Sequence, residues 1–318
     1  MSLSAGLHRT LVIGATGCIG AQVVEALVGQ GASVRATRRW SSAPRASTES
    51  VEWVVADVEQ PATMERAMAG CTAVVFAARL VEPPGGRTVA GRSLARAVGG
   101  LRNVLLEARA HNLHRLVYVS SALTLRPAAP AALTDEHDLD APAPRASAAE
   151  HLAFWTELEV RKFVGLGLPI VIVNPALCLG PGARANPLVD GLRRGSVTVS
   201  SALSAVDVRD VARSIVAAAD RGTIGARYGL GGHAPTFAEL AAAIDGVTGV
   251  SRRRVPLPPG VLDACASLQG LLSARLPLDP ETLAFARAGL RLDDRRARAE
   301  LHHRPRPLED TLRSVLGR

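Results

Sequence analysis

The chain of 318 residues contains very little lysine and tyrosine. Lysine and arginine together number 37, but Lys162 is the one lysine, and the two tyrosines are Tyr118 and Tyr228. A mechanism that combines a tyrosine with a lysine therefore has few residues to draw on. Aromatic residues make up 3% of the chain, and no basic run is interleaved with them. Because bases of single-stranded nucleic acid stack on aromatic side chains, we expect no nucleic-acid partner.

Cysteine is also scarce, with four residues and no CxxC spacing. No metal-binding cluster is indicated, and a reducing compartment fits this pattern best. The segment Met1–Thr10 has no apolar stretch typical of a signal peptide. No run of about 18 apolar residues predicts a membrane span. We therefore expect a cytoplasmic protein without a membrane span.

The composition is otherwise globular, with 47% hydrophobic and 21% charged residues. The net charge is +8, and the arginines are spread along the chain, which favours a solvated basic surface over a dedicated acidic partner. The length exceeds the usual domain of about 100–150 residues, so one large α/β domain or two lobes is expected.

Short apolar runs alternate with helical patterns through the first half of the chain. Such alternation implies right-handed crossovers and a doubly wound, Rossmann-like parallel sheet. The predicted strands are Thr10–Gly14, Ser33–Thr37, Val51–Ala56, Ala73–Ala78, Arg115–Ser120 and Ile170–Asn174, and the predicted helices are Cys18–Gln30, Met64–Ala69, Val89–Ala110 and Ser147–Gly165.

The second half is less regular. We expect a first domain that carries the parallel sheet over residues 1–175 and a smaller, mainly helical lobe over residues 176–318, with segments near 205–230 returning to the first domain. The stretch Arg126–Arg145, rich in Pro, Ala and Asp, predicts a loop. The elements predicted after Pro175 are a strand at Arg227–Leu230 and helices at Asp207–Ala219, Thr236–Thr248, Pro259–Leu272, Leu292–Leu301 and Leu308–Leu316.

The stretch Gly14-Ala15-Thr16-Gly17-Cys18-Ile19-Gly20 joins the first predicted strand to the first predicted helix. Glycines permit a tight turn and a close approach of the backbone to a pyrophosphate. The helix N-terminus adds free N–H donors and a partial positive charge. Because the stretch follows a strand and opens a helix, it predicts a dinucleotide site rather than a plain glycine turn. The domain over residues 1–175 is therefore the expected dinucleotide-binding domain, and the lobe over residues 176–318 is the expected substrate-binding lobe.

With this GxxGxxG spacing the chain resembles the extended short-chain dehydrogenase/reductase superfamily. It is closest to the branch of dihydroflavonol reductases and NAD-dependent epimerase/dehydratases. Ile13 is a departure, because members usually carry a threonine there. The further segments that match the family's motifs are VVADVEQP around Asp57, GGLRNVLLEA around Asn103, Leu116–Ala122, Leu168–Gly182, Val206–Ala212 and Arg227–Gly232.

The resemblance implies a nicotinamide cofactor and names its contacts. Asp57 matches the acidic residue that contacts the adenine. The residues implied to bind the cofactor are Gly14, Thr16, Gly17, Cys18, Ile19, Gly20, Arg38, Arg39, Asp57, Val58, Ala77, Ala78, Ser120, Asn174, Pro175 and Leu177.

The end of the second predicted strand bears on the choice of cofactor. An acidic residue there would accept hydrogen bonds from the ribose 2′-hydroxyl of NAD, but the strand ends Ala36-Thr37-Arg38-Arg39. Arg39 matches the arginine that dihydroflavonol reductases place on the 2′-phosphate, and a guanidinium suits that bidentate task. NADP(H) is therefore favoured over NAD(H). Two solvated surface arginines are the alternative.

Members of the family use a serine or threonine with a Tyr-x-x-x-Lys pair on one helix face. Ser121, beside Ser120, matches the serine that holds the substrate oxygen, and a capping role is its alternative. The pair is missing, because the motif spacing places the tyrosine at Ala149 and the lysine at Ala153. A two-residue slip would instead pair His151 with Trp155 at the same spacing of four, and the imidazole of His151 is a competent proton donor. A surface histidine is the alternative.

An intact cofactor half with a missing acid–base pair predicts an atypical NAD(P)-dependent oxidoreductase acting on CH–OH or C=O. It would reduce a carbonyl of a small, apolar or specialised-metabolite substrate, with a non-standard or substrate-assisted proton donor. The alternatives are a non-catalytic NAD(P)-binding sensor or scaffold, and a sugar-nucleotide-type epimerase or dehydratase. Because relatives often dimerise through the helices around Val89–Ala110 and Ser147–Gly165, a homodimer stays open.

Overall fold

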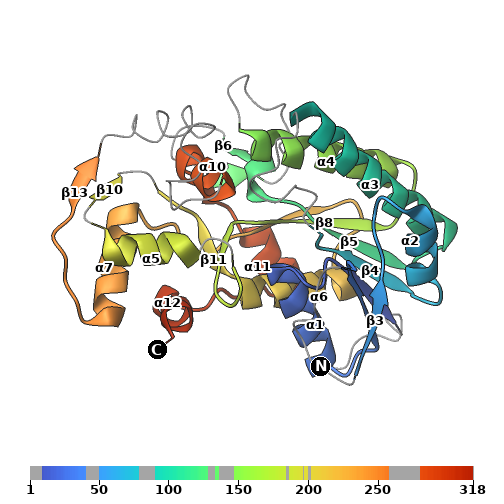
Figure 1. Ribbon diagram of the computed structural model, residues 1–318, viewed down its shortest axis with the longest axis horizontal. Helices are drawn as coiled ribbons and strands as arrows, with labels where there is room; N and C mark the ends of the chain where they lie inside the picture. Colours follow the sequence, from blue (N-terminus) through green and yellow to red (C-terminus); the bar gives the residue numbers. More distant parts are fainter. Residues whose placement is uncertain are drawn as a thin grey trace.

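The computed structural model describes residues 9–40, 50–78, 90–127, 133–135, 147–183, 186–195, 197–199, 202–257 and 280–317. Figure 1 shows a central sheet between two layers of helices, with a smaller group of elements beside it. The sheet has seven strands in the order β12-β8-β5-β4-β1-β2-β3. These strands are β1 (Thr10–Ile13), β2 (Val34–Arg38), β3 (Val51–Val55), β4 (Ala73–Phe76), β5 (Arg115–Val119), β8 (Ile170–Pro175) and β12 (Arg227–Leu230).

Every neighbouring pair in this sheet is parallel. Strands β1, β4 and β8 are buried over their whole lengths, as expected of parallel strands covered on both faces. The predicted doubly wound α/β fold is confirmed.

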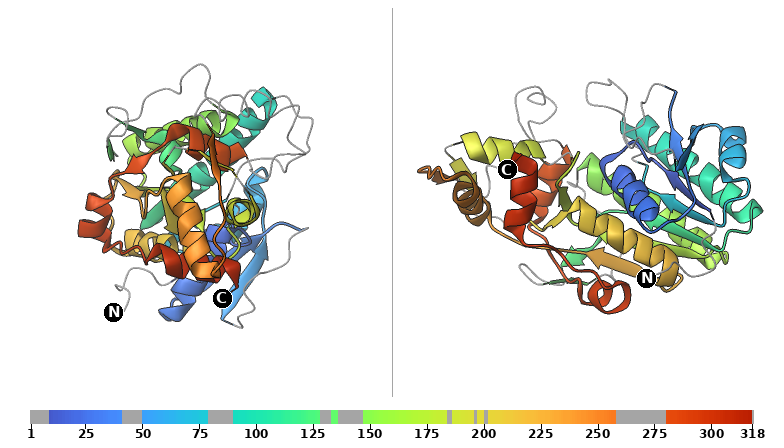
Figure 2. Two further views of the ribbon diagram at one scale, coloured as in Figure 1. Left: turned by 90° about the vertical axis from the view of Figure 1, so that its left-hand side faces the viewer. Right: turned by 90° about the horizontal axis from the view of Figure 1, so that it is seen from below.

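Helices cover both faces of the sheet. On one face α1 (Cys18–Gly29) packs against α6 (Val208–Arg221), and the right-hand view in Figure 2, seen from below, shows them side by side. On the other face lie α2 (Pro61–Met68), α3 (Ala90–Ala110) and α4 (Ala148–Gly165). Side chains alternate between the two resulting cores, because successive residues of a strand point to opposite faces. Val12 joins the core under α1 and α6, whereas Leu11 and Ile13 join the core under α2, α3 and α4.

Two segments of the C-terminal half return to this sheet. Strand β12 pairs with β8, and α6 packs against β5 and β8. Helix α11 (Arg295–Leu301) then packs against α6 and β12, and α10 (Pro280–Ala288) packs against α4 and a 3-10 turn, η1 (Ala122–Thr124).

The remaining elements form the smaller group at the left of Figure 1 and its connections. Helices α5 (Asn186–Arg194), α7 (Phe237–Thr248) and α12 (Leu308–Leu316) pack on one another. Short strands pair in the same region: β9 (Leu177–Leu179) with β11 (Ala205–Asp207), and β10 (Val197–Val199) with β13 (Val255–Leu257). Strand β7 (Leu133–Asp135) pairs with both β6 (Arg126–Pro127) and β14 (Arg291–Leu292).

Several predicted boundaries differ from the structure. Helix α2 begins at Pro61 rather than Met64, because proline is well suited to the first helical position. The stretch Arg126–Arg145 was predicted to be a loop, yet it contains β6 and β7; the rest of it lies outside the described residues. The helix predicted over Leu292–Leu301 begins only at Arg295, because Leu292 belongs to β14. Helices α5 and α10 were not predicted, and the predicted helix Pro259–Leu272 lies outside the described residues.

Within the described ranges, no helix is both long enough and apolar enough to cross a membrane.

Candidate active site

The residues predicted to bind the cofactor follow the carboxyl ends of neighbouring parallel strands. The glycine-rich turn follows β1, Arg39 follows β2, Asp57 follows β3, Ala77 follows β4 and Ser120 follows β5. Because carboxyl ends of parallel strands meet at one edge, the structure brings these segments together. In open α/β sheets, ligands bind in the crevice outside this edge.

The three glycines of the turn have different surroundings. Gly14 has φ +86°, and a Cβ on it would lie 2.5 Å from the Cα of Ala78. A Cβ on Gly20 would collide with the carbonyl of Gly14. Gly17 is different, because its Cβ would meet only the Gly14 oxygen, at 3.2 Å, among the described atoms. Gly14 and Gly20 are therefore required by packing, whereas Gly17 leaves room on the outer side of the turn.

Gly17 is also the N-cap of α1, with no capping side chain and no acidic residue in the first turn. The positive end of the helix therefore faces the room that Gly17 leaves. Backbone N–H groups at a helix N-terminus suit a phosphate. The turn thus fits the pyrophosphate of a dinucleotide.

The neighbouring β2 end is tied to this turn and carries the two arginines. The buried Thr37 accepts a hydrogen bond from the Gly14 N–H at 3.2 Å. Arg38 is partly exposed and Arg39 is exposed. Within the described part of the chain neither guanidinium has an ion-pair partner, so both are available to an anion.

The loop after β3 is held by the GGLRN motif of α3. The Asn103 side chain donates to the Val58 carbonyl at 3.0 Å, and a Cβ on Gly100 would lie 2.9 Å from the Val58 side chain. The Asp57 carboxylate accepts a hydrogen bond from the Glu59 N–H at 3.0 Å, and this local bond closes a short turn. This motif therefore fixes the position of the residues predicted to meet the adenine.

Ser121 caps the η1 turn directly after β5. Its Oγ accepts from the Leu123 N–H at 3.2 Å, so the capping role is present. The same side chain is half-buried at the carboxyl edge of the sheet, where the resemblance places the serine that holds the substrate oxygen. The two roles are compatible, because the cap uses a lone pair of the oxygen and leaves the proton.

Behind Ser121 lies a buried polar cluster that sequence reasoning missed. Glu157 of α4 is 0% exposed, and its Oε1 lies 2.6 Å from Nε of Arg227, whose side chain is 6% exposed. The other carboxylate oxygen accepts from Ser120 at 2.5 Å and from the Asn174 side chain at 2.8 Å. Because a buried carboxylate is costly without partners, these donors determine whether it is tolerated. Asn174, predicted to bind the cofactor, uses its side chain within this cluster.

Glu157 also defines which face of α4 meets the Ser121 turn. Ala153 and Ala149 precede it by one and two helical turns, so they share its face. These are the positions that the resemblance assigns to the lysine and the tyrosine. The face of α4 that meets the Ser121 turn therefore carries only methyl groups at those two positions.

His151 lies two residues from both alanines, which corresponds to about 200° of rotation around the helix. It shares a stripe with Trp155, which is 45% exposed, and with the exposed Lys162. The structure thus turns His151 away from the face that meets Ser120. Its assignment as a proton donor stays a prediction, and this geometry weighs against it.

Neither tyrosine can replace the missing pair. Tyr118 stacks on Phe76 with ring centroids 5.7 Å apart, and burial raises the pKa of its phenol. Tyr228 is fully buried, and its hydroxyl bonds to Glu300 and accepts from the Thr223 N–H at 2.9 Å. Both phenols are structural.

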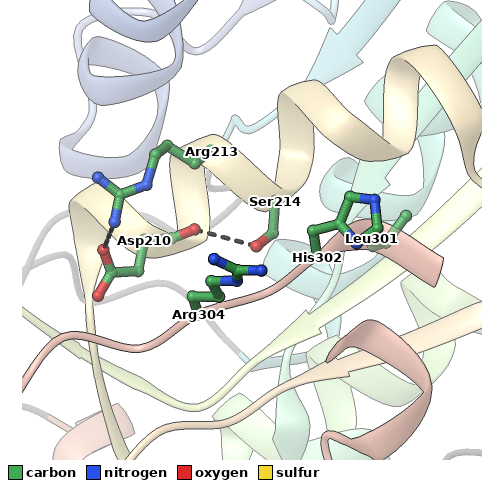
Figure 3. A pocket seen from close by; sticks show the side chains of 6 residues that line it. All are labelled: Asp210, Arg213, Ser214, Leu301, His302 and Arg304. Carbon is green, nitrogen blue, oxygen red and sulfur yellow. Dashed lines mark hydrogen bonds and ion pairs between the residues drawn. The ribbon is translucent and has the colours of Figure 1, made fainter. Parts of the chain in front are cut away.

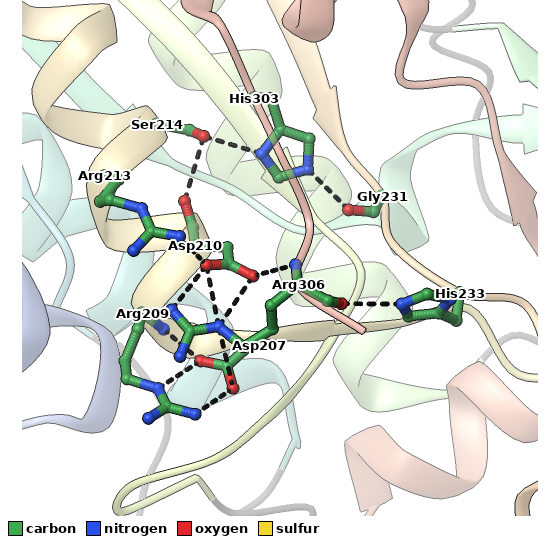
Figure 4. Close-up of polar contacts among 9 residues, drawn as sticks. All are labelled: Asp207, Arg209, Asp210, Arg213, Ser214, Gly231, His233, His303 and Arg306. Carbon is green, nitrogen blue, oxygen red and sulfur yellow. Dashed lines mark hydrogen bonds and ion pairs between the residues drawn. The ribbon is translucent and has the colours of Figure 1, made fainter. Parts of the chain in front are cut away.

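Two late motifs form an anchor on the α6 side of the sheet (Figure 4). The Asp210 carboxylate accepts hydrogen bonds from Arg213 and Arg306, and the Asp207 carboxylate accepts hydrogen bonds from Arg209. The buried His303 bridges Gly231 and Ser214 at 2.7 and 2.8 Å, and burial lowers the pKa of its imidazole. These contacts fasten the segment after α11 to α6.

A hollow of about 360 Å³ lies beside this anchor (Figure 3). It belongs to the surface of α6 and α11, whereas the Glu157 cluster lies on the α4 side of the sheet. The residues that line it are Asp210, Arg213, Ser214, Leu301, His302 and Arg304.

Comparison with known proteins identifies the family. A family model described as NAD(P)H-binding matches residues 14–222, which is more than half of the chain. The chain belongs to this NAD(P)H-binding family, within the extended short-chain dehydrogenase/reductase superfamily and with relatives of the dihydroflavonol-reductase type. The resemblance read from the motifs is confirmed.

Individual relatives cover most of the chain. Sterol demethylase protein B of Methylococcus capsulatus is 29% identical over 307 residues, which is 92% of each chain. A candidate dihydroflavonol 4-reductase of Synechocystis sp. is 31% identical over 259 residues, covering 78% of this chain and 74% of the relative. Among solved structures, a nucleoside-diphosphate-sugar epimerase from Pseudomonas aeruginosa superposes with a TM-score of 0.80 at 24% identity, covering 97% of this chain and 96% of the other. This last likeness concerns the fold.

Proposed function

We propose that the chain is a reductase that uses NADP(H) in preference to NAD(H) and transfers a hydride from the nicotinamide to a carbonyl carbon. The substrate is a small, apolar or specialised metabolite. One observation carries the proposal: the open side of the Gly17 turn and the Ser121 hydroxyl lie at the same carboxyl edge of the sheet. The family match and the reductase name of one relative support it.

Each end of the cofactor has matching residues in this proposal. The N-terminus of α1 binds the pyrophosphate, and Arg38 with Arg39 binds the 2′-phosphate through charge-assisted hydrogen bonds. Asp57 meets the adenine. The cofactor, when bound, supplies the hydride.

Ser121 holds the carbonyl oxygen by donating its hydroxyl proton. This bond stabilises the negative charge that develops on the oxygen as the hydride adds to the carbon. Because Ala149 and Ala153 offer no acid, the proton that completes the alcohol comes from water or from the substrate itself. General acid catalysis contributes about 10²–10⁴-fold, so a substrate that needs little proton help is favoured.

A panel of ketones tests this proposal. NADPH oxidation is followed by absorbance with aromatic, sterol-like and aliphatic ketones, for the wild type and for Ser121→Ala. We expect turnover with at least one ketone and a fall of about 10²-fold in Ser121→Ala at unchanged NADPH affinity. NADPH binding without turnover across the panel would contradict the proposal.

NADPH binding without turnover across the ketone panel would favour a second function. A non-catalytic NAD(P)-binding sensor is favoured specifically by the methyl groups of Ala149 and Ala153, because binding needs no acid–base pair. Its signature is a protein partner whose affinity changes when NADPH is added, in a protein that turns over no ketone.

A further inference from the structure

Thr124, the last residue of η1, lies at the centre of the polar cluster behind Ser121. It is buried, and its hydroxyl has four polar neighbours, three from other elements and one from the N-cap of its own turn. Those neighbours are the Ser121 carbonyl at 2.8 Å, Glu157 Oε2 at 2.8 Å, Asn174 Nδ2 at 2.9 Å and Arg227 Nη2 at 3.1 Å.

The donors and acceptors around this hydroxyl are complementary. The atoms of Arg227 and Asn174 that face the Thr124 hydroxyl are N–H donors, so the Thr124 oxygen accepts a hydrogen bond from both. The Ser121 carbonyl and the Glu157 carboxylate only accept, so they share the single Thr124 proton. The hydroxyl therefore links the buried ion pair to the backbone of Ser121.

The position of the Ser121 side chain follows from the same turn. Its carbonyl also accepts from the Asn174 amide at 3.3 Å and from the Thr124 N–H at 3.1 Å. Its Oγ accepts from Leu123, and within the described residues no acceptor takes its proton. The turn thus fixes the oxygen and leaves the proton to be donated.

We infer that Thr124, supported by Glu157 and Arg227, is a positioning residue that aims the Ser121 hydroxyl at the substrate's carbonyl oxygen. This inference rests on the proposed function for the role of Ser121. It also assigns Asn174 to this support behind the site. We expect this positioning to affect kcat, because a small displacement of a group that holds the substrate lowers the reaction rate strongly.

The experiment compares three variants in kinetics with NADPH and the best ketone. Thr124→Val removes the hydroxyl at nearly equal volume, and Thr124→Ser keeps it. Thr10→Val is the control, because this buried threonine lies at the amino end of β1 and its hydroxyl has no partner among the described residues. We expect Thr124→Val to lower kcat about 10-fold with NADPH Kd within about twofold, and both other variants to match the wild type within about twofold.

A double-variant cycle separates positioning from general structural damage. In the Ser121→Ala background, Thr124→Val should cost nothing further, because the group that it aims is already gone. Equal losses in both backgrounds would overturn the inference.

A second arm does not depend on turnover. Amide hydrogen exchange at Leu123 should accelerate about 10-fold in Thr124→Val and stay at the wild-type rate in Thr124→Ser. If no ketone is turned over, the proposed function fails and this arm alone decides; unchanged exchange in Thr124→Val would overturn the inference. Should Thr124→Val fail to fold, Thr124→Cys takes its place in both arms, because a thiol hydrogen-bonds only weakly.

Discussion

Replacing Arg227 by methionine tests the energetic role of the buried ion pair. The change leaves the fully buried Glu157 carboxylate without its cation, although Ser120, Thr124 and Asn174 still donate to it or lie in contact. Removing one partner of a buried pair costs about 3–5 kcal/mol. Because three neutral donors remain, we expect a loss of about 3 kcal/mol in the free energy of unfolding, at the low end of that range.

Urea unfolding followed by circular dichroism measures this loss. Arg313→Met is the matched control, since Arg313 pairs with Asp310 at 2.9 Å while both side chains are more than half exposed. Exposed pairs contribute about 0–1 kcal/mol. Adding Glu157→Gln to Arg227→Met should recover about 1–2 kcal/mol, because the charge that lacked a partner is removed. A loss in Arg227→Met no larger than in the control would refute the reasoning.

Three further predictions concern the cofactor and the proton donor. Gly17→Val should weaken NADPH binding about 100-fold, because its side chain fills the phosphate side of the turn, while the loss of a favourable N-cap residue costs about 1 kcal/mol of stability. Gly29→Ala on the same helix is the control, and equal NADPH affinities of the two variants in calorimetry would speak against the site. Alanine at Arg38 and at Arg39 should each weaken NADPH about 10-fold more than NADH; equal losses for both cofactors would show the preference to be wrong. His151→Ala should leave kcat within about twofold, because the helical rotation turns His151 away from the face of α4 that carries Glu157. A 10-fold fall in kcat at unchanged NADPH affinity would instead assign His151 as the donor.

The cofactor half of the site was predictable because its signals are local. The glycine turn lies between an apolar strand and a helix, so its seven residues suffice to predict a phosphate site. Arg39 follows β2 and Asp57 follows β3, and parallel pairing brings such positions to one edge of the sheet. Right-handed crossovers then determine which face of the sheet each connecting helix covers.

The support behind Ser121 was not predictable, because tertiary contacts create it. Glu157 and Glu159 alternate on one helix and look like solvated charges in the sequence, and Arg227 lies far along the chain. One signal was available: Glu157 is spaced four and eight residues from Ala153 and Ala149 and therefore shares their face. That spacing also favours this alignment over the one that pairs His151 with Trp155.

The short strands escaped sequence analysis for a related reason. Strands β6, β7 and β14 have two or three residues each, and β14 is far from its partner in the chain. Runs of that length carry no recognisable period of their own. They form only because the packed domains bring their backbones together.

Transfer of deuterium from NADPH to product is the measurement that tests the central proposal most directly. The protein is incubated with the best ketone and with NADPH labelled at one or the other C4 position of the nicotinamide, and the alcohol is analysed by mass spectrometry. We predict one deuterium on the carbinol carbon from one of the two labelled cofactors and none from the other. Tight binding of NADPH with no deuterium in any product would contradict the proposal that this chain is a reductase.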